Sequence, residues 1–235
     1  EGHRGVTTGG RGVRSRATGA DIILGDNGQV TYTPNTTLLQ QVKSTDPTLG
    51  GDDTIAAGLG DNLILGGKGS DTVTAIGGVD LVIGDNGQID WTAAGVFQQI
   101  QTVLHADGAA DTIDVADGNN TVLAGEGADS VTAGTGFDWI VGDNGSILFS
   151  GATVGNVVVK LESTDTVDQP LWNDTIAGGS GENRIIAGMG SDRVTTSGNF
   201  ADIVMGDNGE FVWNNSGVMT SFQTTEPDNG GDDLI

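Results

Sequence analysis

The sequence predicts an all-β fold, a parallel β-roll or β-solenoid with a β-hairpin inserted in each repeat of about 60 residues. The tetrapeptide GDNG occurs four times, and successive copies begin 59, 58 and 64 residues apart, at Gly25, Gly84, Gly142 and Gly206. Within each unit an acidic or amide residue recurs every nine residues. Glycine supplies 41 of the 235 residues, and aromatic residues make up only 5%. Such a chain cannot fill a thick core, but it can form the corners and short strands of a thin solenoid.

The spacing of GDNG divides the chain into a lead segment and four units. Residues 1–18 are a degenerate basic lead segment, which is either an irregular rung or a contact for the acidic body of another copy. Residues 19–77, 78–135 and 136–199 are three full repeats, and residues 200–235 are part of a fourth. Because residues 230–235 resemble residues 50–55 and then stop inside a repeat, we expect a segment of a longer array.

The nine-residue recurrence defines the rungs of the predicted roll. An aliphatic residue follows the acid or amide two positions later, as Ile55 follows Asp53 and Ile64 follows Asn62. Two nonapeptides make one coil, so residues 18 apart are predicted to stack at the spacing of neighbouring strands. The predicted column positions, with a one-residue slip before the thirteenth, are Asp21, Asp53, Asn62, Asp71, Asp80, Asp111, Asn120, Asp129, Asp138, Asp174, Asn183, Asp192, Asp202 and Asp233.

Two of the glycine-rich turns carry a family resemblance. Gly66-Gly67-Lys68-Gly69-Ser70-Asp71 and Gly125-Glu126-Gly127-Ala128-Asp129 resemble the calcium-binding nonapeptide of RTX (repeat-in-toxin, hemolysin-type) proteins, G-G-x-G-x-D-x-U-x. The resemblance covers roughly half of each unit. It implies a β-roll that binds Ca2+ and a protein that crosses the cell envelope unfolded by one-step (type I) secretion. On this basis the protein is expected outside the cell or on its surface.

Electrostatics independently favours a divalent cation in these columns. Two carboxylates about 4.8 Å apart repel by roughly 3–4 kcal/mol at an effective dielectric constant of 20. Ca2+ takes 6–8 carboxylate and carbonyl oxygens, and glycine turns leave carbonyls accessible. Zinc is disfavoured because the chain has no cysteine and only His3 and His105 as histidines. We therefore predict that the column positions bind Ca2+, the alternative being that they only form Asx-turns.

The GDNG segments are expected to interrupt the column. The nine-residue frame continues through them and reaches Val30, Ile89, Ile147 and Phe211, which are apolar. A β-hairpin is predicted to follow, for example with 89–92 opposite 97–100. The aspartates of GDNG and the acids that end each excursion either close a second kind of metal site or only form turns. They are Asp26, Asp85, Asp143 and Asp207, and Asp46, Asp107, Asp165 and Glu226.

The neighbours of the rung aliphatics distinguish the two faces of the roll. The last rung of every block is an unbroken apolar triplet such as Leu81-Val82-Ile83, which indicates a strand covered on both sides. Other rungs, such as Thr72-Val73-Thr74, have small or polar neighbours. One sheet is therefore predicted to be bare, and the other to be covered by the hairpins or by a neighbouring chain.

Composition also excludes several functions. The net charge of −23 disfavours nucleic acid and anionic membranes as partners. No apolar stretch approaches 18 residues, which disfavours insertion into a membrane. The chain has only two histidines, no cysteine and no phosphate-binding loop. Because these residues cannot form similar active sites in several repeats, we expect no enzyme activity.

The leading functional hypothesis is a calcium-stabilised stalk, fibre or filament segment of a large secreted or cell-surface bacterial protein. Its partners would be neighbouring repeats or other copies of the same protein. An adhesin module that binds glycan or another cell through the hairpin tips is the first alternative, and the secretion or folding module of an RTX toxin or protease is another. Ice binding by a threonine face is disfavoured because Ala56, Asp114 and Arg193 interrupt it.

Overall fold

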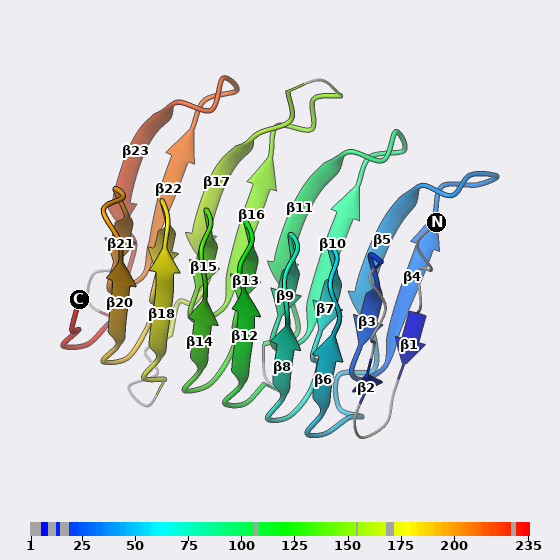
Figure 1. The fold of residues 1–235 in the computed structure, drawn as a ribbon, viewed down its shortest axis with the longest axis horizontal. Helices are drawn as coiled ribbons and strands as arrows, with labels where there is room; N and C mark the ends of the chain where they lie inside the picture. Colours follow the sequence, from blue (N-terminus) through cyan, green and yellow to red (C-terminus); the bar gives the residue numbers. More distant parts are fainter. Residues whose placement is uncertain are drawn as a thin grey trace.

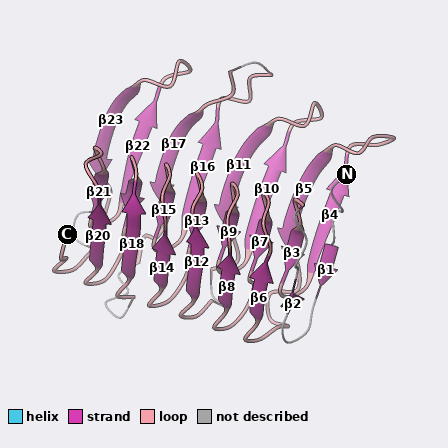
Figure 2. Cartoon of the chain, in the orientation of Figure 1, coloured by secondary structure: helices cyan, strands magenta, loops and turns pink. Residues whose placement is uncertain are grey.

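The computed structural model describes residues 19–105, 108–153, 155–167, 172–226 and 229–235, together with the backbone of residues 6–8 and 13–14. Within these ranges the chain forms strands joined by turns and loops, as Figure 2 shows. No helix in the described ranges is long and apolar enough to cross a membrane. The predicted all-β fold is confirmed.

Two parallel sheets form the roll. Sheet A consists, in spatial order, of β1 (Val6–Thr8), β3 (Ile22–Leu24), β7 (Leu63–Leu65), β9 (Leu81–Ile83), β13 (Thr121–Leu123), β15 (Trp139–Val141), β19 (Arg184–Ile186) and β21 (Ile203–Met205). Sheet B consists of β2 (Val13–Arg14), β6 (Thr54–Ala57), β8 (Thr72–Ala75), β12 (Thr112–Ala116), β14 (Ser130–Ala133), β18 (Thr175–Ser180) and β20 (Arg193–Ser197). The chain alternates between the two sheets, so neighbouring strands within each are successive coils (Figure 1).

The predicted hairpins form a third, antiparallel sheet. Sheet C consists of β4 (Gly28–Tyr32), β5 (Leu39–Ser44), β10 (Gly87–Trp91), β11 (Phe97–Thr102), β16 (Gly145–Phe149), β17 (Val158–Ser163), β22 (Gly209–Trp213) and β23 (Met219–Thr224). Each hairpin also pairs with the next one, as β5 pairs with β10 and β11 with β16. The hairpins therefore join into one continuous layer along the whole roll (Figure 1).

The described part of the lead segment extends the roll. β1 pairs in parallel with β3, and β2 pairs in parallel with β6. Of the two alternatives for residues 1–18, this backbone pairing agrees with an irregular rung. The rest of that segment lies outside the described residues.

The inner core lies between sheets A and B. The sheet A strands from β3 to β19 contribute the central residue of their triplets, such as Ile64 and Val122, and the sheet B strands from β6 to β20 contribute one or two aliphatic side chains each, such as Val73 and Ile113. These four side chains are fully buried. One or two aliphatic side chains from each of these strands are enough to fill this layer because the glycine turns bring the two sheets close together.

The second core lies between sheets A and C. The first and third residues of the sheet A triplets, such as Leu24 and Ile83, pack against Ile89, Ile147 and other hairpin residues. The outward side of sheet B is solvent-exposed at residues such as Thr54. The prediction of one bare sheet and one sheet covered by the hairpins is confirmed.

Ile147 and its neighbour Leu148 allow a matched test of this second core. Ile147 is 1% exposed against sheet A, whereas Leu148 on the opposite side of β16 is 41% exposed. We expect Ile147→Ala to lower the free energy of unfolding by about 2–5 kcal/mol, and Leu148→Ala to change it by less than about 0.5 kcal/mol. Urea unfolding in saturating calcium measures both, and equal effects would show that sheet C does not stabilise the roll.

Candidate metal centre

The turns of the roll form two edges, and every predicted column residue is the last residue of a turn. The aspartate edge contains the turns that lead from sheet A to sheet B, which end at Asp53, Asp71, Asp111, Asp129, Asp174, Asp192 and Asp233. The amide edge contains the turns that lead from sheet B to sheet A, which end at Asp21, Asn62, Asp80, Asn120, Asp138, Asn183 and Asp202. The first column contains only aspartate, and the second alternates aspartate with asparagine.

Each column is a hydrogen-bonded ladder. On the aspartate edge, the backbone N–H of one column residue donates to Oδ1 of the next, from Asp53 to Asp71 and from Asp111 to Asp129, both at 2.7 Å. On the amide edge Asn120 donates in the same way to Asp138 at 2.8 Å. The predicted stacking of residues 18 apart is therefore confirmed.

The expectation that the column stops at GDNG is wrong. The N–H of Asp71 donates to Oδ1 of Asp111 at 2.7 Å, although an entire hairpin separates them in sequence. Asp129 donates to Asp174 at the same distance. The hairpin formed by β10 and β11 is an insertion in the turn that leads from β9 of sheet A to β12 of sheet B. Because the chain returns to this turn after the hairpin, Asp111 takes the next position in the ladder after Asp71. Counting nine residues along the chain cannot detect this return.

The second carboxylate oxygen on the aspartate edge is buried and has no hydrogen-bond partner. This holds for Oδ2 of Asp71, Asp111, Asp129, Asp174 and Asp192. Burying a carboxylate oxygen without a partner costs several kcal/mol unless a cation or donor compensates it. Carboxylate oxygens of this kind are the ligands that calcium prefers.

A backbone carbonyl meets several of these oxygens above a glycine. A Cβ atom at Gly142 would lie 2.2 Å from both the carbonyl oxygen of Ala187 and Oδ2 of Asp174. At Gly84 the corresponding distances, to Ala124 O and Asp111 Oδ2, are both 2.3 Å. The glycine therefore leaves room for two oxygens to converge. Carboxylate and carbonyl oxygens together form the donor set that suits calcium.

The GDNG aspartates also lie on the aspartate edge. Asp85 lies against Gly125 of the next coil, and its Oδ2 accepts the N–H of Glu126 at 2.5 Å. Asp26 is placed in the same way against Gly67, with the N–H of Lys68 2.6 Å from its Oδ2. The equivalent aspartates of the third and fourth units accept hydrogen bonds from Met189 and Gly231: they are Asp143 and Asp207.

Two of the acids that end the hairpin excursions form turns. Asp46 and Glu226 have positive φ angles of 50° and 47°, and their carbonyls accept the N–H of Leu49 and Asn229, each at 2.9 Å. Asp165 accepts hydrogen bonds from the backbone and side chain of Asn144, both at 3.0 Å. Asp107, the remaining acid of this group, lies outside the described residues.

Burial makes the aspartate edge difficult to ionise without a cation. Desolvation raises the pKa of Asp71 to about 8 and that of Asp129 to about 8. For Asp111, desolvation followed by the charges of Asp85 and Asp129 raises the pKa to about 10. The pKa of Asp138 on the amide edge rises only to about 6, because of desolvation.

These pKa shifts predict how the stability of the metal-free chain depends on pH. Because the folded pKa values lie above the unfolded value of 3.8, the folded state binds more protons than the unfolded state between about pH 4 and pH 10. The free energy of unfolding should therefore fall as pH rises through this range, by several kcal/mol at about 1.4 kcal/mol per pKa unit. The strand circular dichroism signal of the chain in metal-depleted buffer at about pH 5 and pH 8 measures this trend, and we expect the larger folded fraction at pH 5. A larger folded fraction at pH 8 would contradict it.

No group of three or more described histidine, aspartate or glutamate side chains converges closely enough to bind one ion alone. An ion on the aspartate edge would therefore need the turn carbonyls as well. Calcium accepts carbonyl ligands readily and tolerates irregular geometry, so the donor set fits it. The ion would supply the positive charge that the stacked carboxylates lack.

The repeats have a recognised sequence family. The profile of the RTX calcium-binding nonapeptide repeat matches residues 48–82, 60–88, 103–122, 123–146 and 173–199. The chain carries RTX calcium-binding nonapeptide repeats. RTX repeats bind Ca2+, and their role is structural rather than catalytic. RTX repeats are also typical of proteins exported by type I secretion. No curated protein and no solved structure shows significant similarity to the chain.

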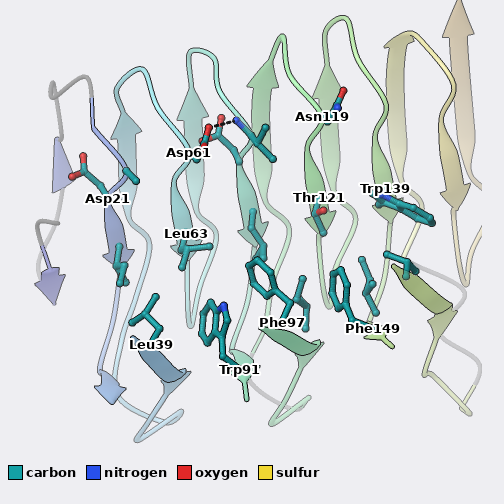
Figure 3. A pocket seen from close by; sticks show the side chains of 18 residues that line it. Asp21, Leu39, Asp61, Leu63, Trp91, Phe97, Asn119, Thr121, Trp139 and Phe149 are labelled. Carbon is teal, nitrogen blue, oxygen red and sulfur yellow. Dashed lines mark hydrogen bonds between the residues drawn. The ribbon is translucent and has the colours of Figure 1, made fainter. Parts of the chain in front are cut away.

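The RTX roll also contains a cavity that sequence reasoning missed. It has a volume of about 510 Å³ and lies between sheets A and C. In Figure 3, Trp91, Phe97 and Phe149 of sheet C line it opposite Leu63 and Trp139 of sheet A. The aromatic rings form a row, with centroids 5.0 Å apart for Trp91 and Phe97 and 5.5 Å apart for Phe97 and Phe149. Trp91 and Phe97 face each other within one hairpin, whereas Phe149 comes from the next unit and is brought to them by the pairing of β11 with β16.

Proposed function

We propose that this RTX segment is a calcium-stiffened stalk or filament section of a large bacterial protein that acts outside the cell or on its surface. The observation that carries the proposal is the unbroken ladder of aspartates along one edge of the roll, from Asp53 to Asp233, in which all but the half-buried Asp233 are buried. A rod whose every coil contributes an equivalent buried carboxylate is rigid only when these charges are neutralised. This supports a mechanical role that calcium controls.

The proposed mechanism is linkage between calcium binding and folding. The carboxylate and carbonyl oxygens converge only in the folded roll, so calcium binds the folded state and adds its binding free energy to stability. A chain of net charge −23 would remain unfolded where calcium is scarce, as in the bacterial cytosol. It could then cross the type I export channel as an extended chain and fold on reaching calcium outside.

The partners we propose are neighbouring repeats or other copies of the same protein. Sheet C ends at β4 and β23 in the described part of the chain, and β23 exposes Phe222 at 64%. An open strand edge with an exposed aromatic side chain favours pairing with a further strand. Such pairing would continue all three sheets in the same direction.

Small-angle scattering and light scattering test this proposal. In millimolar calcium we expect a rigid rod, and for the filament alternative a mass that grows with protein concentration. A constant monomeric mass with a rod-like profile would support the stalk instead. A compact or flexible particle in calcium would contradict both.

An adhesin module that binds glycan is the second candidate, and the cavity favours it. Its row of aromatic rings, with Asp61 and Asn119 among its polar lining residues, combines apolar faces with hydrogen-bonding groups, as small-molecule sites do. The hairpin tips, where the sequence had suggested binding, differ from unit to unit. Glycan-array binding in calcium, compared between Trp91→Ala in the cavity and Tyr32→Ala at the end of β4 beside the first hairpin tip, separates the two locations. An absence of any glycan signal for the unaltered protein would exclude this function.

A further inference from the structure

We propose that calcium binds along only one edge of the roll, the aspartate edge, while the amide edge is held together by side-chain amides without metal. The inference rests on the proposed calcium-dependent function and specifies where the ions bind. It departs from the equal use of both columns that the nonapeptide spacing predicts, because the two columns differ in chemistry.

On the amide edge, asparagine donates hydrogen bonds to the turn carbonyls. Nδ2 of Asn62 donates to the carbonyl oxygen of Gly60 at 2.8 Å and to that of Gly58 at 3.4 Å. Nδ2 of Asn183 donates to Gly178 O at 2.9 Å. A side-chain amide has two N–H donors, so it satisfies turn carbonyls that would otherwise be available to coordinate a cation. The asparagine amide therefore occupies the place that an ion would take.

Asparagine also separates the negative charges on this edge. Asp80 lies between Asn62 and Asn120 in the ladder, and Asp138 lies between Asn120 and Asn183. Nδ2 of Asn62 further donates to Oδ1 of Asp80 at 2.8 Å. Oδ2 of Asp80 and Oδ2 of Asp138 are buried without a partner. However, the nearest carboxylates in this column are two coils apart, about 9.6 Å, which halves their repulsion relative to adjacent coils.

The aspartate edge has the opposite character. Its column contains a carboxylate on every coil, and the GDNG aspartates add more carboxylates to the same edge. Asp143 is 0% exposed, its Oδ1 has no hydrogen-bond partner, and the charges of Asp174 and Asp192 act on it. In the third unit, three buried aspartates thus lie near one another on adjacent turns. The described Lys160 and Arg184 ion pairs involve Glu162, Glu210 and Glu182 and so do not neutralise these three aspartates.

The glycines give an independent indication. At Gly66, Gly84 and Gly142 on the aspartate edge, a carboxylate oxygen and a carbonyl oxygen converge within 2.5 Å of the absent Cβ. At Gly118 and Gly136 on the amide edge, the nearest atoms are carbonyl oxygens of the neighbouring coil, at 1.7 and 1.8 Å, with asparagine side chains next. At Gly134 on the same edge, Asp117 Oδ1 and Ala116 O lie 2.5 and 2.7 Å from the absent Cβ, but this Oδ1 already accepts the N–H and the hydroxyl of Thr135. Mixed cradles whose carboxylate oxygen has no hydrogen-bond partner therefore occur on the aspartate edge, at Gly66, Gly84 and Gly142.

Asp138 and Asp174 provide a matched test, since both are buried aspartates that end turns of the same coil. Their exposed fractions are 0% and 1%, and each accepts a ladder hydrogen bond from the preceding coil, at 2.8 and 2.7 Å. We would count bound calcium by native mass spectrometry in Asp138→Asn, Asp174→Asn and the unaltered chain. We expect Asp174→Asn to lose at least one ion and Asp138→Asn to lose none.

Equal losses in the two variants, or no loss in either, would overturn the assignment to one edge while leaving calcium binding intact. A complete absence of calcium from the unaltered chain would instead refute the proposed function. Because Asp174→Asn could fail to fold, Asn120→Asp provides a second test. This substitution places carboxylates on three successive coils of the amide edge, at positions 80, 120 and 138. We expect the number of bound calcium ions to rise. An unchanged count would overturn the inference that the asparagine amides keep ions off this edge.

Discussion

Removal of calcium at neutral pH is expected to unfold the RTX roll and abolish its β-strand circular dichroism signal. Desolvation raises the pKa of Asp85 to about 9 and that of Asp192 to about 7. Without calcium near pH 7, the carboxyl groups of the aspartate edge would therefore either carry buried negative charges or remain protonated. When the free calcium concentration is 100 times the dissociation constant of a site, binding at that site adds about 2.7 kcal/mol to the free energy of unfolding. Two to five such sites would together contribute about 5–14 kcal/mol, which is comparable with the usual net stability of 5–15 kcal/mol.

The measurement is a calcium titration of metal-depleted protein, followed by circular dichroism. We expect little regular strand signal before calcium is added, and a cooperative rise with increasing calcium. Magnesium at the same concentration is the control, and it should be much less effective because it requires a strict octahedron and retains its waters. A chain that keeps its strand signal and melting temperature in excess chelator would contradict the metal-dependent fold.

Gly142→Ala is expected to destabilise the third unit and to weaken its calcium binding together. The backbone at Gly142 does not have the positive φ that favours glycine, so alanine meets no conformational penalty there. The new methyl group would instead lie 2.2 Å from both Ala187 O and Asp174 Oδ2. Overpacking of this kind costs about 1–3 kcal/mol. Displacement of two candidate ligand oxygens should also weaken calcium affinity at least about tenfold, or about 1.4 kcal/mol.

Gly51→Ala is the matched control for this substitution. Gly51 also lies in a turn of the aspartate edge without the positive φ that favours glycine, but a Cβ atom there meets no atom within 4 Å. We expect its calcium midpoint and melting temperature to match those of the unaltered chain or to rise slightly. Isothermal titration and thermal melts compare the two variants. If Gly142→Ala behaved like Gly51→Ala, the convergence of oxygens above Gly142 would have no role in metal binding.

Much of this fold follows from periodicity in the sequence. The period of nine identifies Val73 and Val82 as inward-facing residues, and both are 0% exposed. The hairpin predicted at 89–92 and 97–100 corresponds to β10 and β11, with Ile89 opposite Ile100. Local pattern is sufficient here because side chains alternate along a strand, and each coil repeats the environment of the one before it.

The continuity of the aspartate column could not be predicted in this way. In the sequence, Ile89 occupies the position where the nine-residue frame expects a ligand. In space the next ligand position after Asp71 belongs to Asp111, 40 residues later. The frame fails because it measures distance along the chain, whereas the ladder depends on where the hairpin returns.

The sequence by itself determined the composition of the two columns, the positions of the strands and the acidic character that requires a cation. These properties depend on residue type and local spacing, which any single unit displays. Only the tertiary structure decided that the hairpins join into one sheet, that the aspartate column runs unbroken beneath them, and that the GDNG aspartates lie on the same edge. These features arise from contacts between coils, where burial and the convergence of oxygens from distant segments determine which charges need calcium.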